Sequence, residues 1–179
     1  ARRVLWAAAS FRSLGFPGCA GSSTPSAPPT PTADASEPST TTEAVTSTTA
    51  VADAEAQVAR AATGKVRLLP KHVKLFADGA IISQLMQMRE PYLDDSGHPD
   101  LCHHGEWMMQ PETFRAFFRA YWTAGWQPHV HVNGDAGLDL VLDTVEECLA
   151  AHPRDDHRTV IVHFANSTEE QVDRIARLG

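Results

Sequence analysis

The amino-acid sequence predicts an α/β fold built around a parallel sheet, and two observations carry this prediction. Short apolar segments of strand character alternate, over residues 65–179, with longer segments whose apolar residues recur at helical spacing. Residues 158–164 are almost continuously apolar, which is typical of a strand covered on both faces of a parallel sheet. This alternation also implies right-handed crossover connections between neighbouring strands.

The first half of the folded part contains strands, a long loop and a helix. Residues 66–69 and 72–76 are strand-like, and residues 90–110 are rich in Pro, Gly, Asp and His, which predicts a long loop. A helix is predicted over residues 111–125, because Pro111 suits a first helical turn and five aromatic residues form one apolar stripe. The stripe consists of Phe114, Phe117, Phe118, Tyr121 and Trp122.

The second half repeats a strand and a helix twice. Residues 129–132 alternate between valine and histidine, which predicts a short strand. Apolar residues recur every three or four positions over residues 135–151, so a helix is expected there. The strand at 158–164 follows, and Ser167 or Thr168 is expected to cap a last helix.

The first third of the chain differs in composition from the rest. Residues 21–49 are almost entirely Ser, Thr, Pro and Ala, with too few large apolar side chains to offset the entropy lost on ordering. We therefore expect residues 1–63 to be a disordered, low-complexity leader, with a short alanine-rich helix possible over residues 50–62, and residues 64–179 to form the folded domain.

Composition excludes several classes of protein. The chain has 179 residues and a net charge of -7, so one core can form and nucleic acid is not an expected partner. No apolar run is long enough to span a membrane. The three cysteines (Cys19, Cys102 and Cys148) are scattered, which favours a reducing, cytoplasmic location. The weaker alternative is export or organelle targeting through the arginine-containing, acid-poor N-terminal segment.

His129 and His131 form the most informative motif. Side chains two positions apart on a strand point to the same face, so the two imidazoles lie side by side. Neutral imidazoles on a rigid strand, with Asp135 following, suit a first-row metal. The alternative is a pair of partly buried, hydrogen-bonded histidines.

Lys74 and His163 extend this pattern to neighbouring strands. Lys74 lies between Val73 and Leu75, either as a solvent-facing lysine on an edge strand or as an inward amine whose pKa burial lowers. His163 lies at the carboxyl end of its strand and follows His131 by 32 residues, about one βα repeat of an eight-fold barrel.

Three segments together resemble the amidohydrolase superfamily, and more narrowly its amidohydrolase 3 (YtcJ-like) branch. They are residues 73–79 (VKLFADG), residues 129–135 (HVHVNGD), and His163 followed by residues 170–179 (EQVDRIARLG). The resemblance covers residues 65–179 and implies part of a distorted (β/α)8 barrel, strands four to six, holding one or two divalent metals, usually zinc. It further implies hydrolysis of a non-peptide, amide-like carbon–nitrogen bond in a small molecule by metal-activated water.

The resemblance also implies roles for individual residues. Lys74, when carboxylated, corresponds to a lysine that bridges two metals on the fourth strand, and His131 and His163 correspond to metal ligands on the fifth and sixth. His129 is expected one layer deeper, supporting the ligands without binding metal. Asp135 is expected to cap the following helix or to orient His131.

The sequence departs from this family in two places. Neither the paired histidines of the family's first strand nor the proton-shuttling aspartate of its eighth strand has a counterpart, so no catalytic acid is assigned. We expect an incomplete barrel, with Trp107 as the candidate substrate contact. The alternatives are a non-catalytic metal-binding or interaction fragment, which self-associates through an open barrel edge, and a different α/β protein whose histidines are incidental.

Overall fold

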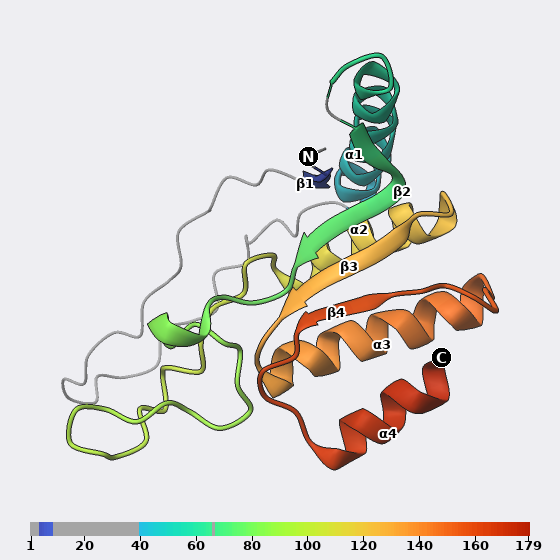
Figure 1. Cartoon of the computed structure of the whole chain (residues 1–179). Helices are drawn as coiled ribbons and strands as arrows, with labels where there is room; N and C mark the ends of the chain where they lie inside the picture. Colours follow the sequence, from blue (N-terminus) through green and yellow to red (C-terminus); the bar gives the residue numbers. More distant parts are fainter. Residues whose placement is uncertain (1–3, 9–39, 66) are drawn as a thin grey trace, which may run out of the picture.

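The computed structural model describes residues 4–8, 40–65 and 67–179. These residues form an α/β fold around one sheet of four parallel strands in the order β1-β2-β3-β4 (Figure 1). The strands are β1 (Val4–Ala8), β2 (Arg67–Phe76), β3 (Gln127–Val132) and β4 (Val160–His163). The helices are α1 (Thr40–Ala61), the short 3-10 helix η1 (Ile81–Ser83), α2 (Pro111–Thr123), α3 (Asp135–Ala151) and α4 (Glu169–Leu178).

The register of the sheet aligns the carboxyl ends of β2, β3 and β4. Lys74 lies opposite His129, and Phe76 lies opposite His131. His163 lies opposite Val132 on the far side of β3. Parallel strands that end together present the loops that follow them at one edge of the sheet. The alternating valines and histidines of β3 therefore divide between two faces, as the sequence predicts.

The described helices cover one face of the sheet. Valines and leucines of β2 and β3 point to this face and pack against the aromatic stripe of α2 and the apolar face of α3. The largest fully buried members of this core include Leu75, Val73, Val130, Val132, Phe114, Phe118, Trp122, Leu138 and Val141. Burial of these side chains supplies the main driving force for docking the helices on the sheet.

None of the described helices covers the other face of the sheet, which is called the bare face below. It carries His72, Lys74, Gln127, His129 and His131, whose side chains are neither fully buried nor fully exposed. The apolar sequence of β4 predicted a strand covered on both faces, and this expectation is wrong. The residues of β4 are half-buried or exposed, because the described helices pack against one side of it only.

The structure also differs from the expected disorder in part of the leader. β1 pairs with β2, and α1 spans 22 residues where a short helix was expected. α1 packs on the core through Val51 and Ala54, and the Tyr121 hydroxyl donates a hydrogen bond to the Ala50 carbonyl at 3.2 Å. Tertiary packing thus stabilises a helix of modest amphipathicity. Residues 1–3 and 9–39 lie outside the described residues, and the boundary at residue 64 stays a prediction.

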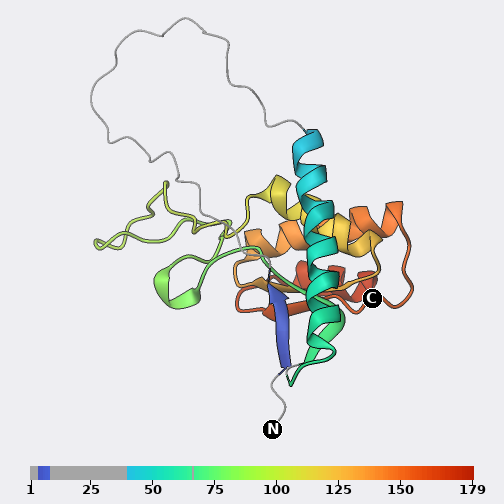
Figure 2. The ribbon, with the colours of Figure 1, turned by 90° about the horizontal axis from the view of Figure 1, so that it is seen from above.

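The remaining elements follow the sequence closely. α2 and α3 occupy the predicted segments, and Thr168 caps α4 in a reciprocal arrangement with Gln171, whose side chain accepts from the Thr168 backbone N–H. The segment between β2 and α2 projects beyond the carboxyl ends of β2, β3 and β4 (Figure 1), and it extends to one side, away from α1 (Figure 2). Within the described parts of the chain, no helix combines the length and the apolar character that crossing a membrane requires.

Candidate functional site

Two histidines meet at the carboxyl ends of β3 and β4. The ring centroids of His131 and His163 lie 4.5 Å apart, with the rings nearly perpendicular at 75°. Because β3 and β4 are parallel neighbours, their last residues are brought together from positions far apart in the sequence. This convergence of two imidazoles is the central feature of the site.

The backbone at the end of β4 makes this contact possible. By register, His163 lies opposite Val132, whose side chain is buried on the helix side of the sheet. However, φ is 79° at His163 and 53° at Phe164, a left-handed conformation that residues other than glycine rarely adopt. The chain therefore turns sharply here, and the ring of His163 reaches His131. Such conformations cost free energy and cluster at functional sites.

Lys74 lies on the same bare face, one strand away. Its Nζ is 5.6 Å from the centroid of the Phe76 ring, and that ring is 5.2 Å from the ring of His131. β2 lies between β1 and β3, so Lys74 is not on an edge strand. Burial lowers the pKa of the Lys74 amine, as the inward interpretation of the sequence predicted. Lys74 is thus linked to His131 through the Phe76 ring, and His131 contacts His163 directly; these three residues are called the rim below.

The surroundings of His131 favour its neutral form. Burial is the main cause that lowers the pKa of His131, and the charges of His163 and Lys74 lower it further. The Gly79 carbonyl and the Asp78 carboxylate act in the opposite direction. A neutral imidazole retains the lone pair with which histidine binds a metal.

Asp78 supports this rim, although the sequence analysis assigned it no role. Its side chain is fully buried and accepts three backbone hydrogen bonds, from Asn133 at 2.9 Å, Gly134 at 2.7 Å and Gln87 at 3.0 Å. Burial raises the pKa of Asp78, and these three donors oppose the rise. Asp78 therefore ties the end of β2 to the end of β3. Its position in the Ala-Asp-Gly sequence that closes a strand was the available signal.

His129 lies deeper on the bare face than His131. It faces Lys74 across the β2–β3 pairing, its Nε2 is 3.0 Å from the Gln127 Nε2, and its ring is 5.6 Å from that of His72. Burial lowers the pKa of His129, and the charges of His72 and Lys74 add to the effect. These contacts agree with a supporting position beside Lys74, and its role stays a prediction.

Asp135 and Trp107 have structural contacts that the sequence did not reveal. The Asp135 carboxylate accepts the backbone N–H of Arg89 and that of Ala136, each at 3.0 Å, so it binds the long loop to the start of α3. Gly134, and not Asp135, occupies the N-cap position of α3. The hydrogen bonds of Asp135 to described residues do not include one to His131. The backbone of Trp107 pairs with that of Asp78 in an isolated antiparallel β-bridge, and the Trp107 side chain packs against the core.

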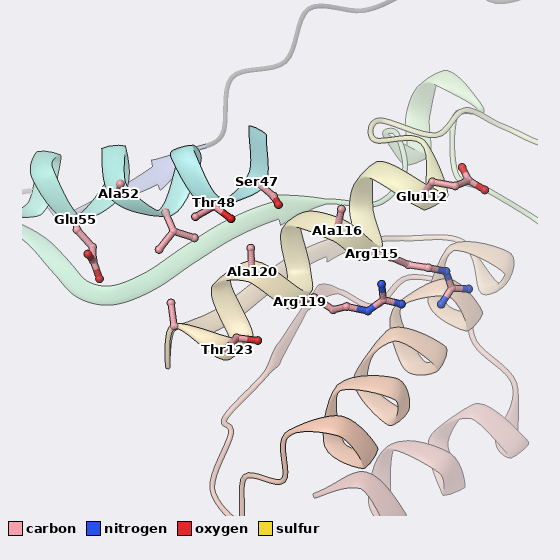
Figure 3. A pocket seen from close by; sticks show the side chains of 12 residues that line it. Ser47, Thr48, Ala52, Glu55, Glu112, Arg115, Ala116, Arg119, Ala120 and Thr123 are labelled. Atoms are coloured by element: carbon pink, nitrogen blue, oxygen red, sulfur yellow. The ribbon is translucent and has the colours of Figure 1, made fainter. Parts of the chain in front are cut away.

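A cavity of about 880 Å³ lies elsewhere, between α1 and α2 (Figure 3). It is on the helix layer, whereas His131 is on the opposite face of the sheet. Three of its four charged side chains have ion-pair partners, because Glu55 pairs with Lys71, and Arg115 and Arg119 both pair with Glu147. The lining consists of Ser47, Thr48, Val51, Ala52, Glu55, Glu112, Arg115, Ala116, Arg119, Ala120, Thr123 and Ala124. It holds none of the predicted site residues.

The rim offers part of a metal-ligand set. Across the described ranges, no group of three or more His, Cys, Asp or Glu side chains could hold a metal ion. The rim instead holds two imidazoles in contact and one lysine amine whose charge acts on His131, and a protonated amine is not a ligand. The donor set fits a divalent metal once the lysine carries anionic oxygens, as a carbamate does. The arrangement is therefore compatible with the predicted site and does not complete it.

Comparisons with known proteins relate this chain to one family. The chain is 30% identical to Protein LONG AFTER FAR-RED 3 of Arabidopsis thaliana and 28% identical to "Putative amidohydrolase YtcJ" of Bacillus subtilis (strain 168), each over 106 residues. These matches cover 59% of the chain but 17% and 18% of the two relatives. The chain thus spans less than a fifth of their length.

Solved structures give the same indication. Uncharacterized metal-dependent hydrolases of Pyrococcus horikoshii OT3 and Pyrococcus furiosus match with TM-scores of 0.50 and 0.51 and identities of 27% and 28%. Each match covers 63% of this chain and 21% of the other. The family described as "Amidohydrolase family" matches residues 1–179, which extends beyond the motif-bearing residues 65–179 into the leader. The chain belongs to the amidohydrolase family.

Proposed function

We propose that this chain carries part of the metal centre of a hydrolase that acts on amide-like carbon–nitrogen bonds of small molecules. The observation that carries the proposal is the 4.5 Å approach of His131 and His163 at the ends of adjacent parallel strands. Membership of the amidohydrolase family and the similarity to metal-dependent hydrolases support it. On this proposal the four parallel strands are an arc of a (β/α)8 barrel, whose chemistry lies at the carboxyl ends of the strands.

Each residue of the rim has a defined task in this proposal. His131 and His163 hold a divalent metal, proposed to be zinc, through neutral ring nitrogens. Lys74 would contribute carbamate oxygens to the metal, after its neutral amine adds to carbon dioxide and releases one proton to solvent. Burial favours this reaction, because it lowers the pKa of Lys74 and so increases the nucleophilic neutral amine. A bound divalent metal polarises a carbonyl and lowers the pKa of water.

Metal binding by the purified chain tests the proposal. Isothermal titration with Zn²⁺ in bicarbonate buffer is expected to show saturable binding, which Lys74→Ala and His163→Ala each weaken at least tenfold. His152→Ala is the matched control, because His152 is exposed at the far end of α3, and it is expected to bind like the wild type. Absence of binding, or equal losses in all three variants, would contradict the proposed site.

A second candidate is a metal-binding or interaction module without catalytic activity. The sheet face that the described helices leave uncovered favours it, because such a face can associate with a partner. The two candidates differ in turnover. A zinc-loaded chain that releases amine from simple N-acyl substrates supports the hydrolase, whereas saturable zinc binding without turnover supports the module.

A further inference from the structure

The carboxamide of Asn133 joins the ends of β2 and β3 next to His131. Its side chain is 2% exposed, and its Nδ2 lies 2.9 Å from the Gly79 carbonyl oxygen and 3.0 Å from the His131 Nε2. We propose that Asn133 is a positioning residue that holds neutral His131 in the tautomer with its proton on Nδ1. The functional meaning of this inference, that Asn133 competes with a metal for His131, rests on the proposed role of His131 as a metal ligand, whereas the tautomer itself does not.

The orientation of the amide follows from its contact with Gly79. A carbonyl oxygen has no hydrogen and can only accept, so the Asn133 nitrogen must face the Gly79 oxygen. The same nitrogen carries a second hydrogen, which is available to the His131 Nε2 at 3.0 Å. Nε2 then accepts through its lone pair. A neutral imidazole with an accepting Nε2 carries its proton on Nδ1.

The other end of the amide supports this orientation. The Asn133 Oδ1 is buried and has no hydrogen-bond partner among the described residues. A buried oxygen without a partner costs free energy, so the two bonds at Nδ2 must outweigh that cost. Turning the amide over would instead place Oδ1 against the Gly79 oxygen, where two acceptors repel each other. The observed orientation is therefore the one that the neighbouring backbone selects.

The Gly79 carbonyl oxygen is an acceptor for which Asn133 and the Nε2–H tautomer of His131 compete. The His131 Nε2 lies 3.5 Å from the Gly79 oxygen, so a proton on Nε2 would have this carbonyl as its acceptor. Histidine ligands of metals commonly donate their second N–H to a carbonyl or carboxylate in this way. Asn133 already donates to the same oxygen and presents N–H to Nε2. In the metal-free chain it thus opposes the tautomer that leaves Nδ1 open to a metal. A metal that binds His131 therefore has to displace the Asn133 amide from Nε2 or reverse this tautomer.

Nitrogen-15 NMR of the full chain tests this inference without any metal. Long-range proton–nitrogen spectra at pH 8, where the ring is neutral, distinguish protonated from unprotonated ring nitrogens, and His131→Gln identifies the signals. The wild type is expected to show a protonated Nδ1. In Asn133→Leu, a near-isosteric change, the Gly79 oxygen loses its Asn133 donor and can accept a proton from the His131 Nε2. The tautomer ratio is therefore expected to move about tenfold toward Nε2–H.

The controls separate this role from general packing. Asn166→Leu removes an amide that contacts the Met88 sulfur at 3.6 Å, so the His131 signals are expected to stay unchanged. A scalar coupling between the Asn133 Nδ2 and the His131 Nε2 in the wild type is a second measurement, which needs no variant. A wild-type ring protonated on Nε2, or an unchanged ratio in folded Asn133→Leu, would overturn the proposal. Failure to bind zinc bears on the proposed function and leaves this result standing.

Discussion

His131 depends on groups from three parts of the chain. Lys74 comes from the neighbouring strand, Gly79 from the start of the loop, and His163 from the end of β4. Only its spacing from His129 could be read from local sequence. The contacts that determine its charge are made by residues distant in the chain, which is why its protonation could be assigned only from the fold.

The free energy of unfolding is expected to decrease as the pH falls, because of His131. Burial holds its pKa below the ordinary 6.5, so the unfolded chain takes up the proton first as the pH falls. The native state thus loses stability from about pH 6.5 downward, until the pH reaches the lowered pKa. Urea unfolding between pH 5 and pH 8, a range chosen around the ordinary histidine pKa, is expected to show a flatter pH dependence for His131→Gln than for the wild type.

His152→Gln provides the comparison for this measurement. The His152 side chain is exposed, so its removal is expected to leave the pH dependence of unfolding close to that of the wild type. A variant of His131 that keeps the full wild-type slope would show that the buried ring is not the source.

The sequence predicted the members of the site better than their arrangement. Lys74, His131 and His163 were singled out from strand patterns and a family resemblance. The structure puts His131 and His163 in ring contact and links Lys74 to them through Phe76, and their role as a site stays a prediction. Strand alternation alone would place His163 with Val132 on the helix side. Two consecutive left-handed residues change that direction, and side-chain periodicity carries no information about such a turn.

The long connection between β2 and α2 is held to the site by backbone contacts. Gln87 donates its N–H to Asp78, and its carbonyl accepts the N–H of Gly137 at 3.1 Å. A Cβ atom on Gly134 would lie 2.0 Å from the Gln87 oxygen, so this close approach requires glycine. The composition of residues 90–110 predicted a loop, but not the contacts that fix it.

Gly134→Ala is expected to loosen this connection. The new methyl group meets backbone atoms that cannot move independently, and we expect a loss of about 3 kcal/mol in the free energy of unfolding, as for overpacking elsewhere. Urea denaturation measures the loss, and limited proteolysis of residues 84–110 is expected to accelerate.

Gly97→Ala is the matched variant. Gly97 has a positive φ of 80° but open space around it, so a cost of about 1 kcal/mol from backbone strain is expected. Equal losses in the two variants would mean that the approach of Gln87 to Gly134 does not constrain the loop.

Helix prediction succeeded where apolar residues form a strong stripe and failed where they do not. α2 and α3 lie within one or two residues of the predicted segments. In the region of α1 the sequence predicted only a short helix, because threonine and alanine residues do not form a clear apolar stripe. Its position is stabilised by contacts with α2 and β2, which a local pattern does not contain.

At the scale of the whole molecule, the helices that the structure describes lie on one side of the sheet. A family relationship could predict strands and their order, but the chain spans less than a fifth of the relatives it matches. The described residues leave the outer edge of β4 and the bare face of the sheet uncovered. Exposed edges and faces of this kind promote association with further strands.

We expect the isolated chain to self-associate through this bare face. Val162 lies opposite His131 and so belongs to the same face, where its side chain is half-buried. A carboxylate at this position opposes burial, so Val162→Glu is expected to shift the chain toward monomer in sedimentation velocity at increasing concentration.

Val172→Glu tests whether any added negative charge has the same effect. Val172 is 47% exposed on α4, away from the bare face. This variant is expected to associate like the wild type. A wild type that stays monomeric, or equal behaviour of the two glutamate variants, would contradict association through the sheet.

The carboxylate of Asp78 also has a consequence for how the molecule opens. The amide hydrogens of Gln87, Asn133 and Gly134 share this single acceptor, although they belong to two segments that are distant in the chain. Breaking the loop away from β3 thus requires that the whole junction separate. Deuterium uptake at the three amides is accordingly governed by one cooperative opening, with a common protection, rather than by independent local fraying.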